Sequence, residues 1–318
     1  MHLQEVNKMG KRVFMFPGQG SQYIGMGKDF YETNEAAKAV YDLAKEVTGI
    51  DVAALCFEEN DKLNITEYTQ ICMLTTEAAI YAALMEAGVK PDMTAGLSLG
   101  EYGALIASKA MSMEDAFAVV KKRGLYMQEA VPTGGAMSAV LGLDADIIEE
   151  CCKKVAKEQN AVVSIANYNC PGQIVITGQV DAVTKAGELC KEAGAKRVLP
   201  LKVSGPFHSE MLVGAGEKLG VELENVEFGD IEVPYITNVT ADYVTNKEDI
   251  KGLLQKQVCA SVRWQQTIEK LIADGATEFV EIGPGRTLTG FMKKINKDSE
   301  ITSVNIDKLE DFTNYVNK

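Results

Sequence analysis

The chain has 318 residues, of which 46% are hydrophobic and 24% charged, and its formal net charge is −13. This composition is typical of a globular protein with one or two large cores. The negative charge argues against nucleic acid and against anionic membranes as partners. The longest apolar runs are interrupted well short of the ~20 residues that a membrane span requires, so we expect no membrane segment.

The seven cysteines show no C-x-x-C spacing, and the only histidines are His2 and His208. This pattern offers no metal-binding set and predicts free thiols, which are typical of a reducing cytoplasm. The polar N-terminal segment lacks the apolar core of a secretory signal, and Met9 is a second candidate for the first residue. We therefore expect a cytoplasmic protein without a metal, and we expect it to be a monomer.

The outer parts of the chain alternate between strand and helix patterns. Such alternation is typical of an α/β fold with a mainly parallel sheet that is covered by helices on both faces. The predicted strands cover residues 12–16, 94–98 and 277–282, and the predicted helices cover residues 35–48, 69–87 and 261–274.

The middle of the chain follows a different pattern. Strands are predicted over residues 136–141, 161–167, 173–177 and 196–203, and helices over residues 144–159 and 180–193. Their order, β-α-β-β-α-β, is that of a ferredoxin-like unit. We therefore predict a large α/β hydrolase-like catalytic subdomain, residues 1–133 and 204–318, and an inserted small ferredoxin-like subdomain, residues 134–203. The active site is expected in the cleft between them.

A G-x-S-x-G frame places Ser98 between Gly96 and Gly100. In a nucleophile elbow a strand turns sharply into a helix, glycines stand where side chains would clash, and the serine hydroxyl is pushed clear of the backbone. The N–H of Leu99 would then face an oxyanion that forms on an attacked carbonyl. A plain turn between strand and helix is the alternative on this pattern alone.

His208 is the only credible base for such a serine, because His2 lies in the polar N-terminal arm. It stands in a turn-rich loop after an apolar segment, a setting that suits a catalytic residue. The alternative is a structural histidine that caps the helix expected to begin at Ser209.

Arg123 lies on the apolar stripe of a predicted helix. It shares one helix face with Ala116, Val120 and Met127, whereas Lys121 and Lys122 point elsewhere. An inward arginine could hold a substrate carboxylate in two parallel hydrogen bonds. The alternative is a guanidinium that reaches solvent from the edge of the stripe.

Taken together, these motifs resemble those of the malonyl-CoA:acyl carrier protein transacylases, the acyltransferases of type II fatty acid synthesis. The resemblance runs over nearly the whole chain, through ordered motifs at similar spacing. They are residues 16–22, residues 96–102, Arg123 in its Lys-Arg-Gly context, residues 167–173, residues 205–208, Gln257 with residues 262–264, and residues 281–285.

The resemblance implies a ping-pong reaction with two substrates and no cofactor. Ser98 would attack the thioester of malonyl-CoA while His208 accepts its proton, which would give a malonyl-serine ester. The phosphopantetheine thiol of acyl carrier protein would then take the malonyl group. The expected activity is therefore that of an acyltransferase that supplies malonyl-acyl carrier protein for fatty acid synthesis.

The resemblance also implies roles for neighbouring residues. The N–H groups of Gln19 and Leu99 would form the oxyanion hole, and Arg123 would bind the malonyl carboxylate. The main-chain carbonyl of Gln257 would orient the histidine, and the bulk of Phe207 would select malonyl over methylmalonyl groups. One departure is Leu97, because many members have a histidine immediately before the serine.

Three alternatives stay open at this stage. A serine hydrolase would share the elbow and the histidine but would leave an inward Arg123 unexplained. A non-catalytic docking subunit would leave Ser98, His208 and Gln19 unexplained. A stand-alone acyltransferase that serves a polyketide synthase differs from the leading hypothesis only in the carrier protein that it uses.

Overall fold

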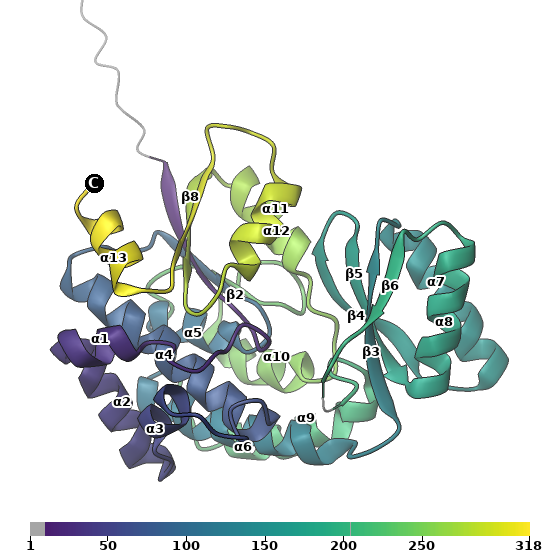
Figure 1. The fold of residues 1–318 in the computed structure, drawn as a ribbon, viewed down its shortest axis with the longest axis horizontal. Helices are drawn as coiled ribbons and strands as arrows, with labels where there is room; N and C mark the ends of the chain where they lie inside the picture. The colour runs from purple at the N-terminus through teal and green to yellow at the C-terminus, as the bar shows by residue number, and fades with distance from the viewer. Residues whose placement is uncertain (1–9, 204) are drawn as a thin grey trace, which may run out of the picture.

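The computed structural model describes residues 10–203 and 205–318, so the expectations for His2 and Met9 lie outside the described residues. A five-stranded sheet forms the centre of the large body (Figure 1), and each pair of neighbouring strands is parallel. Its strand order is β7-β2-β1-β8-β9. The strands are β1 (Lys11–Phe16), β2 (Met93–Gly96), β7 (Tyr235–Ile236), β8 (Ala276–Ile282) and β9 (Thr302–Ile306).

Strand β1 shows why this sheet is covered on both faces. Its side chains alternate between two cores, because successive residues of a strand point to opposite faces. Phe14 and Phe16 belong to one core, whereas Val13 and Met15 belong to the other. All four are buried.

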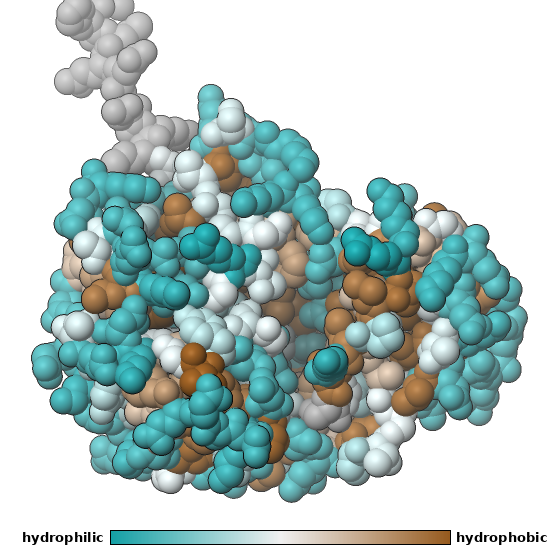
Figure 2. All heavy atoms as spheres, in the orientation of Figure 1, coloured by the Kyte–Doolittle hydropathy of each residue, from teal (hydrophilic) through white to brown (hydrophobic). Residues whose placement is uncertain are grey.

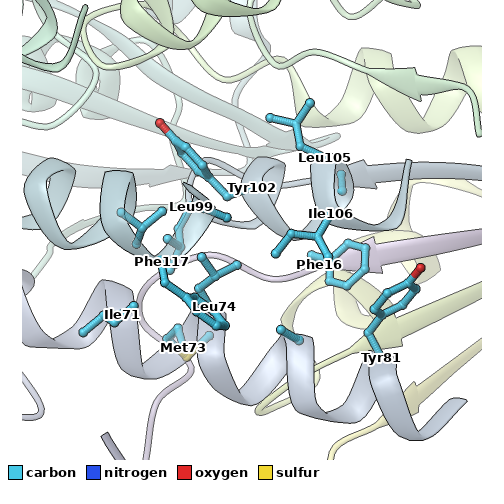
Figure 3. Close-up of a cluster of buried hydrophobic side chains, with 14 of the residues drawn as sticks. Phe16, Ile71, Met73, Leu74, Tyr81, Leu99, Tyr102, Leu105, Ile106 and Phe117 are labelled. Atoms are coloured by element: carbon cyan, nitrogen blue, oxygen red, sulfur yellow. The ribbon is translucent and has the colours of Figure 1, made fainter. Parts of the chain in front are cut away.

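Part of the first core lies between two helices of the large body. Figure 3 shows Leu74 and Tyr81 of α4 (Thr66–Glu86) on the side of this helix that faces Ile106 of α5 (Gly100–Ala107). Helix α4 is buried along most of its length, so it lacks a polar face. The second core is covered by α11 (Trp264–Ala273) and α12 (Thr287–Ile295).

The remaining helices of the large body surround these cores. Helix α6 (Met113–Ala130) begins after Ser112, whose side chain accepts a hydrogen bond from the Asp115 N–H and so caps the helix. The others are α1 (Lys28–Thr33), α2 (Glu35–Thr48), α3 (Val52–Phe57), α9 (Val213–Leu223), α10 (Ile250–Gln257) and α13 (Leu309–Val316), with 3₁₀ turns at Glu210–Leu212 and Lys247–Asp249.

A separate four-stranded sheet lies at the other side of the molecule, on the right of Figure 1. Its order is β4-β5-β3-β6 and all its neighbouring pairs are antiparallel, which is the arrangement predicted for the ferredoxin-like unit. The α/β fold class is therefore confirmed. The elements are β3 (Gly135–Leu141), α7 (Ala145–Gln159), β4 (Val163–Cys170), β5 (Gln173–Gln179), α8 (Val180–Glu192) and β6 (Arg197–Pro200).

Backbone hydrogen bonds fix the small sheet to the large body beside the site. The Tyr168 N–H donates to the Val262 carbonyl at 2.9 Å, and the Val262 N–H donates to the Ala166 carbonyl at 2.8 Å. The Ser261 hydroxyl adds a bond of 2.6 Å to the Ile165 carbonyl. These contacts place β4 next to the segment that precedes α11.

Several predicted boundaries differ from the structure. The strand predicted over 196–203 runs from Arg197 to Pro200, and beyond it the Leu201 N–H still donates to the Met137 carbonyl at 2.9 Å. Because β6 lies at the sheet edge, it can end early without breaking a second ladder. The strand predicted over 94–98 ends at Gly96, because Ser98 adopts a left-handed φ of 54°. The strand predicted over 161–167 runs from Val163 to Cys170. Strands β7 and β9 were not predicted, since they are short and lie at the sheet edges.

Three further expectations concern cysteines, membrane segments and metal sites. All seven cysteines lie within the described residues, and none forms a disulfide. Among residues 10–203 and 205–318, no helix combines the length and the apolar character needed to cross a membrane. In the same ranges no cluster of three or more histidine, cysteine or acidic side chains could hold a metal ion.

Candidate active site

Ser98 lies in the sharp turn between β2 and α5. Its φ of 54° is in the left-handed region, which is uncommon for a residue other than glycine. A Cβ atom at position 96 would overlap the Gly100 carbonyl, and one at position 100 would overlap the Phe16 carbonyl. The elbow therefore needs glycine at both positions because the backbone segments approach closely, as the sequence pattern predicted.

The His208 ring lies against the serine hydroxyl. Ser98 Oγ is 2.8 Å from His208 Nε2, whereas His208 Nδ1 is 2.9 Å from the Gln257 carbonyl and 3.1 Å from the Ala260 carbonyl. Because a carbonyl oxygen only accepts, Nδ1 carries the proton in this arrangement. The unprotonated Nε2 then faces Ser98 and can take its proton.

Electrostatics favour the neutral imidazole. Burial lowers the pKa of His208 to about 4, and the positive charge of Arg123 lowers it as well. The hydrogen bonds from Nδ1 to the two carbonyls raise the pKa but do not offset the burial. His208 is therefore unprotonated at neutral pH, as a base must be.

Arg123 turns inward from α6 and is 1% exposed. Its Nη1 donates to Gln70 Oε1 at 2.6 Å, and its Nη2 donates to Ser98 Oγ at 3.1 Å and to Gln257 Oε1 at 3.0 Å. Its buried Nε makes no hydrogen bond among the described residues. These contacts leave the Nε–H and one Nη1 N–H of the guanidinium without a protein acceptor.

The loop after β1 approaches the elbow from the other side. A Cβ atom at position 18 would lie 2.8 Å from the Leu97 carbonyl, so glycine allows this close approach. Gln19 follows directly, and its side chain donates to Thr66 Oγ1 at 3.1 Å. Within the described part of the chain, neither the Gln19 N–H nor the Leu99 N–H donates a hydrogen bond to the protein.

A cavity of about 230 Å³ opens above Ser98. Figure 2 shows the surface hollowed between the large body and the small sheet, with hydrophobic side chains gathered on the side of the small sheet. Leu97 and Phe207 both line this cavity, and Phe207 is only 7% exposed. The large body also contributes Gln19, Gln70, Ser98, Leu99, Arg123 and His208, and the small sheet contributes Met137, Asn167, Asn169 and Val175.

The structure thus brings all the residues singled out in the sequence to one site. It also adds residues that sequence reasoning missed. Asn238 holds the elbow, since its Oδ1 accepts from the Ser98 N–H at 2.6 Å and its Nδ2 donates to the Gly96 carbonyl at 2.6 Å. Glu101 is fully buried behind Ser98. Glu101 lies within the motif over residues 96–102 and Gln70 within the helix predicted over residues 69–87, but the sequence analysis assigned neither a role. Asn238 gave no local signal.

Comparisons with known proteins agree over nearly the whole chain. The model of the family "Acyl transferase domain" matches residues 13–307. The malonyl CoA-acyl carrier protein transacylase of Bacillus subtilis (strain 168) is 50% identical over 291 residues, which cover 91% of this chain and 92% of the relative.

Solved structures give the same result. The malonyl CoA-acyl carrier protein transacylase from Clostridium perfringens Atcc 13124 superposes with a TM-score of 0.92 at 43% identity, covering 96% of each chain. A malonyl-transacylase solved in complex with a type II PKS acyl-carrier protein has a TM-score of 0.92 at 39% identity, covering 96% of this chain and 99% of the other. The chain therefore belongs to the acyl transferase family and, within it, to the malonyl CoA-acyl carrier protein transacylases.

Proposed function

We propose that this acyltransferase moves a malonyl group from malonyl-CoA to the phosphopantetheine thiol of an acyl carrier protein, through a malonyl ester on Ser98. One observation carries the proposal. Ser98 Oγ lies 2.8 Å from His208 Nε2 and 3.1 Å from Arg123 Nη2, so that nucleophile, base and a buried cation meet at one atom. The names of the relatives support the same substrates.

In the first half-reaction, Ser98 Oγ attacks the thioester carbonyl while its proton passes to His208 Nε2. The negative charge that develops on the carbonyl oxygen is accepted by the N–H groups of Leu99 and Gln19, which have no protein acceptor among the described residues. The carbon–sulfur bond then breaks, and His208 returns the proton to the leaving CoA sulfur. The product is a malonyl ester on Ser98.

Arg123 is proposed to bind the free carboxylate of the malonyl group. Its remaining Nη1 N–H can donate to this carboxylate in the buried cavity, and its Nη2 can exchange the contact to Ser98 Oγ for a second hydrogen bond to the same carboxylate. Charge-assisted hydrogen bonds of this kind are about twice as strong as neutral ones. The arginine thereby favours acyl groups that carry a second acid.

In the second half-reaction, His208 takes the proton of the incoming phosphopantetheine thiol as its sulfur attacks the ester carbonyl. The ester bond to Ser98 then breaks and the serine oxygen recovers the proton from His208. The main-chain carbonyl of Gln257 holds the ring in place through Nδ1 during both steps. No cofactor takes part in the proposed sequence.

The carrier protein is proposed to be that of fatty acid synthesis. A polyketide carrier is the second candidate, because one of the similar structures is a malonyl-transacylase bound to a type II PKS acyl-carrier protein. Transfer rates to purified carriers of both kinds would separate the two. The proposal also includes the division into subdomains 1–133 with 204–318 and 134–203, a cytoplasmic location and a monomeric state.

Intact-protein mass spectrometry after brief exposure to malonyl-CoA tests the proposed function. Acetyl-CoA and methylmalonyl-CoA serve as parallel substrates, and the Ser98→Ala protein serves as the control. A malonyl adduct on the wild type alone supports the nucleophile and the acyl class. If the folded protein forms no adduct with any of the three, the proposed acyl donor is wrong.

The rate of acyl-enzyme formation is expected to stay constant from neutral pH down to about pH 5. It should reach half its maximum near pH 4, because the pKa of His208 is lowered to about 4 and only the neutral ring can accept the proton of Ser98. Rapid-quench measurements across this range provide the test. A half-maximum near pH 6.5, the ordinary value for histidine, would contradict the buried and desolvated ring.

The Phe207→Ala variant is expected to accept methylmalonyl-CoA better. Phe207 lines the cavity next to His208, so its removal makes room for an additional methyl group. The ratio of kcat/KM for methylmalonyl-CoA to that for malonyl-CoA should rise by about 10- to 200-fold. Phe291→Ala, which removes an equally buried phenylalanine that also lines the cavity, is the matched control. An equal rise in both variants would argue against a specific role of Phe207.

A further inference from the structure

We propose that Glu101 is a positioning residue for acyl transfer, which acts on His208 and Ser98 through Gln257 and Asn238. The inference rests on the proposed function, since it assigns a new residue to the same reaction. In the family pattern described above, the histidine is oriented by a main-chain carbonyl and not by an acid. The structure nevertheless places a buried carboxyl group one side chain away.

The surroundings of Glu101 are unusual for a carboxyl group. The residue is in the first turn of α5 and is 0% exposed. Its Oε2 accepts hydrogen bonds from Gln257 Nε2 at 2.7 Å and from the Asn238 N–H at 3.0 Å. Its Oε1 has no hydrogen-bond partner among the described residues. A buried carboxyl group that lacks a direct ion pair is unfavourable for folding, which suggests a functional reason for it.

Glu101 fixes the orientation of the Gln257 amide. The Nε2 of this amide donates to Glu101 Oε2 and, at 2.9 Å, to the Ser98 carbonyl. Both partners are acceptors, so the nitrogen must face them and the amide oxygen must face the other way. There it accepts from Arg123 Nη2 at 3.0 Å. The main-chain carbonyl of Gln257, which accepts from His208, is held in place with its side chain.

The second route runs through Asn238 to the elbow. Glu101 Oε2 accepts a hydrogen bond from the Asn238 N–H. The Asn238 side chain in turn accepts a hydrogen bond from the Ser98 N–H and donates one to the Gly96 carbonyl. These bonds clamp the turn in which Ser98 keeps its left-handed conformation. A single carboxylate oxygen therefore supports both the nucleophile and the carbonyl that orients the base.

The charge of Glu101 also acts on the base. The reaction forms an imidazolium, and in many serine enzymes a carboxylate at Nδ1 stabilises it. Here the Nδ1 partners are carbonyls, and the cation of Arg123 opposes the imidazolium. Burial raises the pKa of Glu101, whereas the hydrogen bonds from Asn238 and Gln257 and the charge of Arg123 lower it. In its ionised form Glu101 offsets the cation of Arg123. The groups that face it are Arg123 of α6, Tyr102 of α5 itself, Tyr235 of β7 and, through Gln257 of α10, His208.

The Glu101→Gln variant separates the charge from the hydrogen bonds, because the amide oxygen can accept the same two N–H groups. We expect the rate constant of acyl-enzyme formation from malonyl-CoA to fall about 10- to 100-fold. The KM for malonyl-CoA should not rise, because Arg123 loses a compensating negative charge. For the same reason the imidazolium is less stable, so the half-maximum of the pH profile should move to lower pH.

The matched control is Glu77→Gln on α4. Glu77 is also 0% exposed, and neither of its carboxyl oxygens has a hydrogen-bond partner among the described residues. This variant should keep the wild-type rate constant and pH profile. The rate constant of acylation, measured in a single turnover, does not depend on the fraction of folded enzyme. A merely structural Glu101 would therefore change the thermal midpoint and leave this constant unchanged, which would overturn the proposal.

A second variant, Glu101→Asp, decides the question if the glutamine variant does not fold. Aspartate keeps the charge but is too short to hold Gln257 and Asn238 together, so acylation should slow while the half-maximum of the pH profile stays near that of the wild type. A folded aspartate variant with the wild-type rate constant would overturn the positioning role. Failure of the wild type itself to form an acyl-enzyme would instead overturn the proposed function.

Discussion

The Ser98→Ala variant is expected to lose malonyl transfer to acyl carrier protein by roughly 10⁴- to 10⁶-fold. The alanine has no oxygen to form the ester, whereas the proposed oxyanion donors, Arg123 and His208 all remain. The elbow should keep its shape, since Asn238 bonds the backbone of residues 96 and 98 and not the serine hydroxyl. Steady-state kinetics measures the loss of malonyl transfer, and intact-protein mass spectrometry measures the loss of the malonyl-enzyme.

The control for this variant is Ser108→Ala at the other end of α5. Ser108 is also buried, and its hydroxyl donates to the Leu105 carbonyl at 2.9 Å. Its loss should lower the stability of the protein but leave the acyl-enzyme intact. If malonyl-CoA still labels the Ser98→Ala protein at another residue, Ser98 is not the nucleophile.

The Arg123→Ala variant is expected to lose activity in a way that depends on the acyl group. Truncating one partner of a buried charge pair typically costs about 2–5 kcal/mol, so kcat/KM for malonyl-CoA should fall roughly 30- to 5,000-fold. Acetyl-CoA has no carboxylate to bind, so its kcat/KM should fall much less. The acetyl reaction also reports the loss of the contacts from Arg123 to Ser98 and Gln257.

Lys122→Ala provides the comparison for the arginine variant. It removes one positive charge from the neighbouring position of α6, where the side chain is 45% exposed and 4.0 Å from Glu222. Exposed ion pairs contribute little to folding stability, and Lys122 does not line the cavity. Both substrates should therefore react with this variant at wild-type rates. Equal losses of malonyl and acetyl transfer in Arg123→Ala would exclude the carboxylate-binding role.

Local patterns in the sequence were sufficient for much of the site. The close approaches at Gly96 and Gly100 are properties of one short turn, and the inward direction of Arg123 follows from helix periodicity. His208 was identified because the chain offers hardly any other imidazole. The order β-α-β-β-α-β likewise predicted the small antiparallel sheet.

Long-range contacts set the limit of this reasoning. Asn238 reaches the Ser98 N–H across 140 positions of sequence, and Gln257 reaches Glu101 across 156. Glutamate, asparagine and glutamine side chains are mostly exposed in folded proteins, so residue type alone did not show that Glu101 is buried. The early end of β6 could not be predicted either, because an edge strand can begin or stop without disturbing its neighbours.

The place of β1 in the sheet has a consequence for the synthesis of the protein. Strand β1 is flanked by β2 and β8, and the paired side chains of Arg12 and Glu278 are 266 positions apart. At about 5–20 residues per second, a ribosome needs roughly 13–53 s to add that length of chain. During this interval the nascent strand has at least one unpaired edge, which leaves it open to chaperone binding and to aggregation before translation ends.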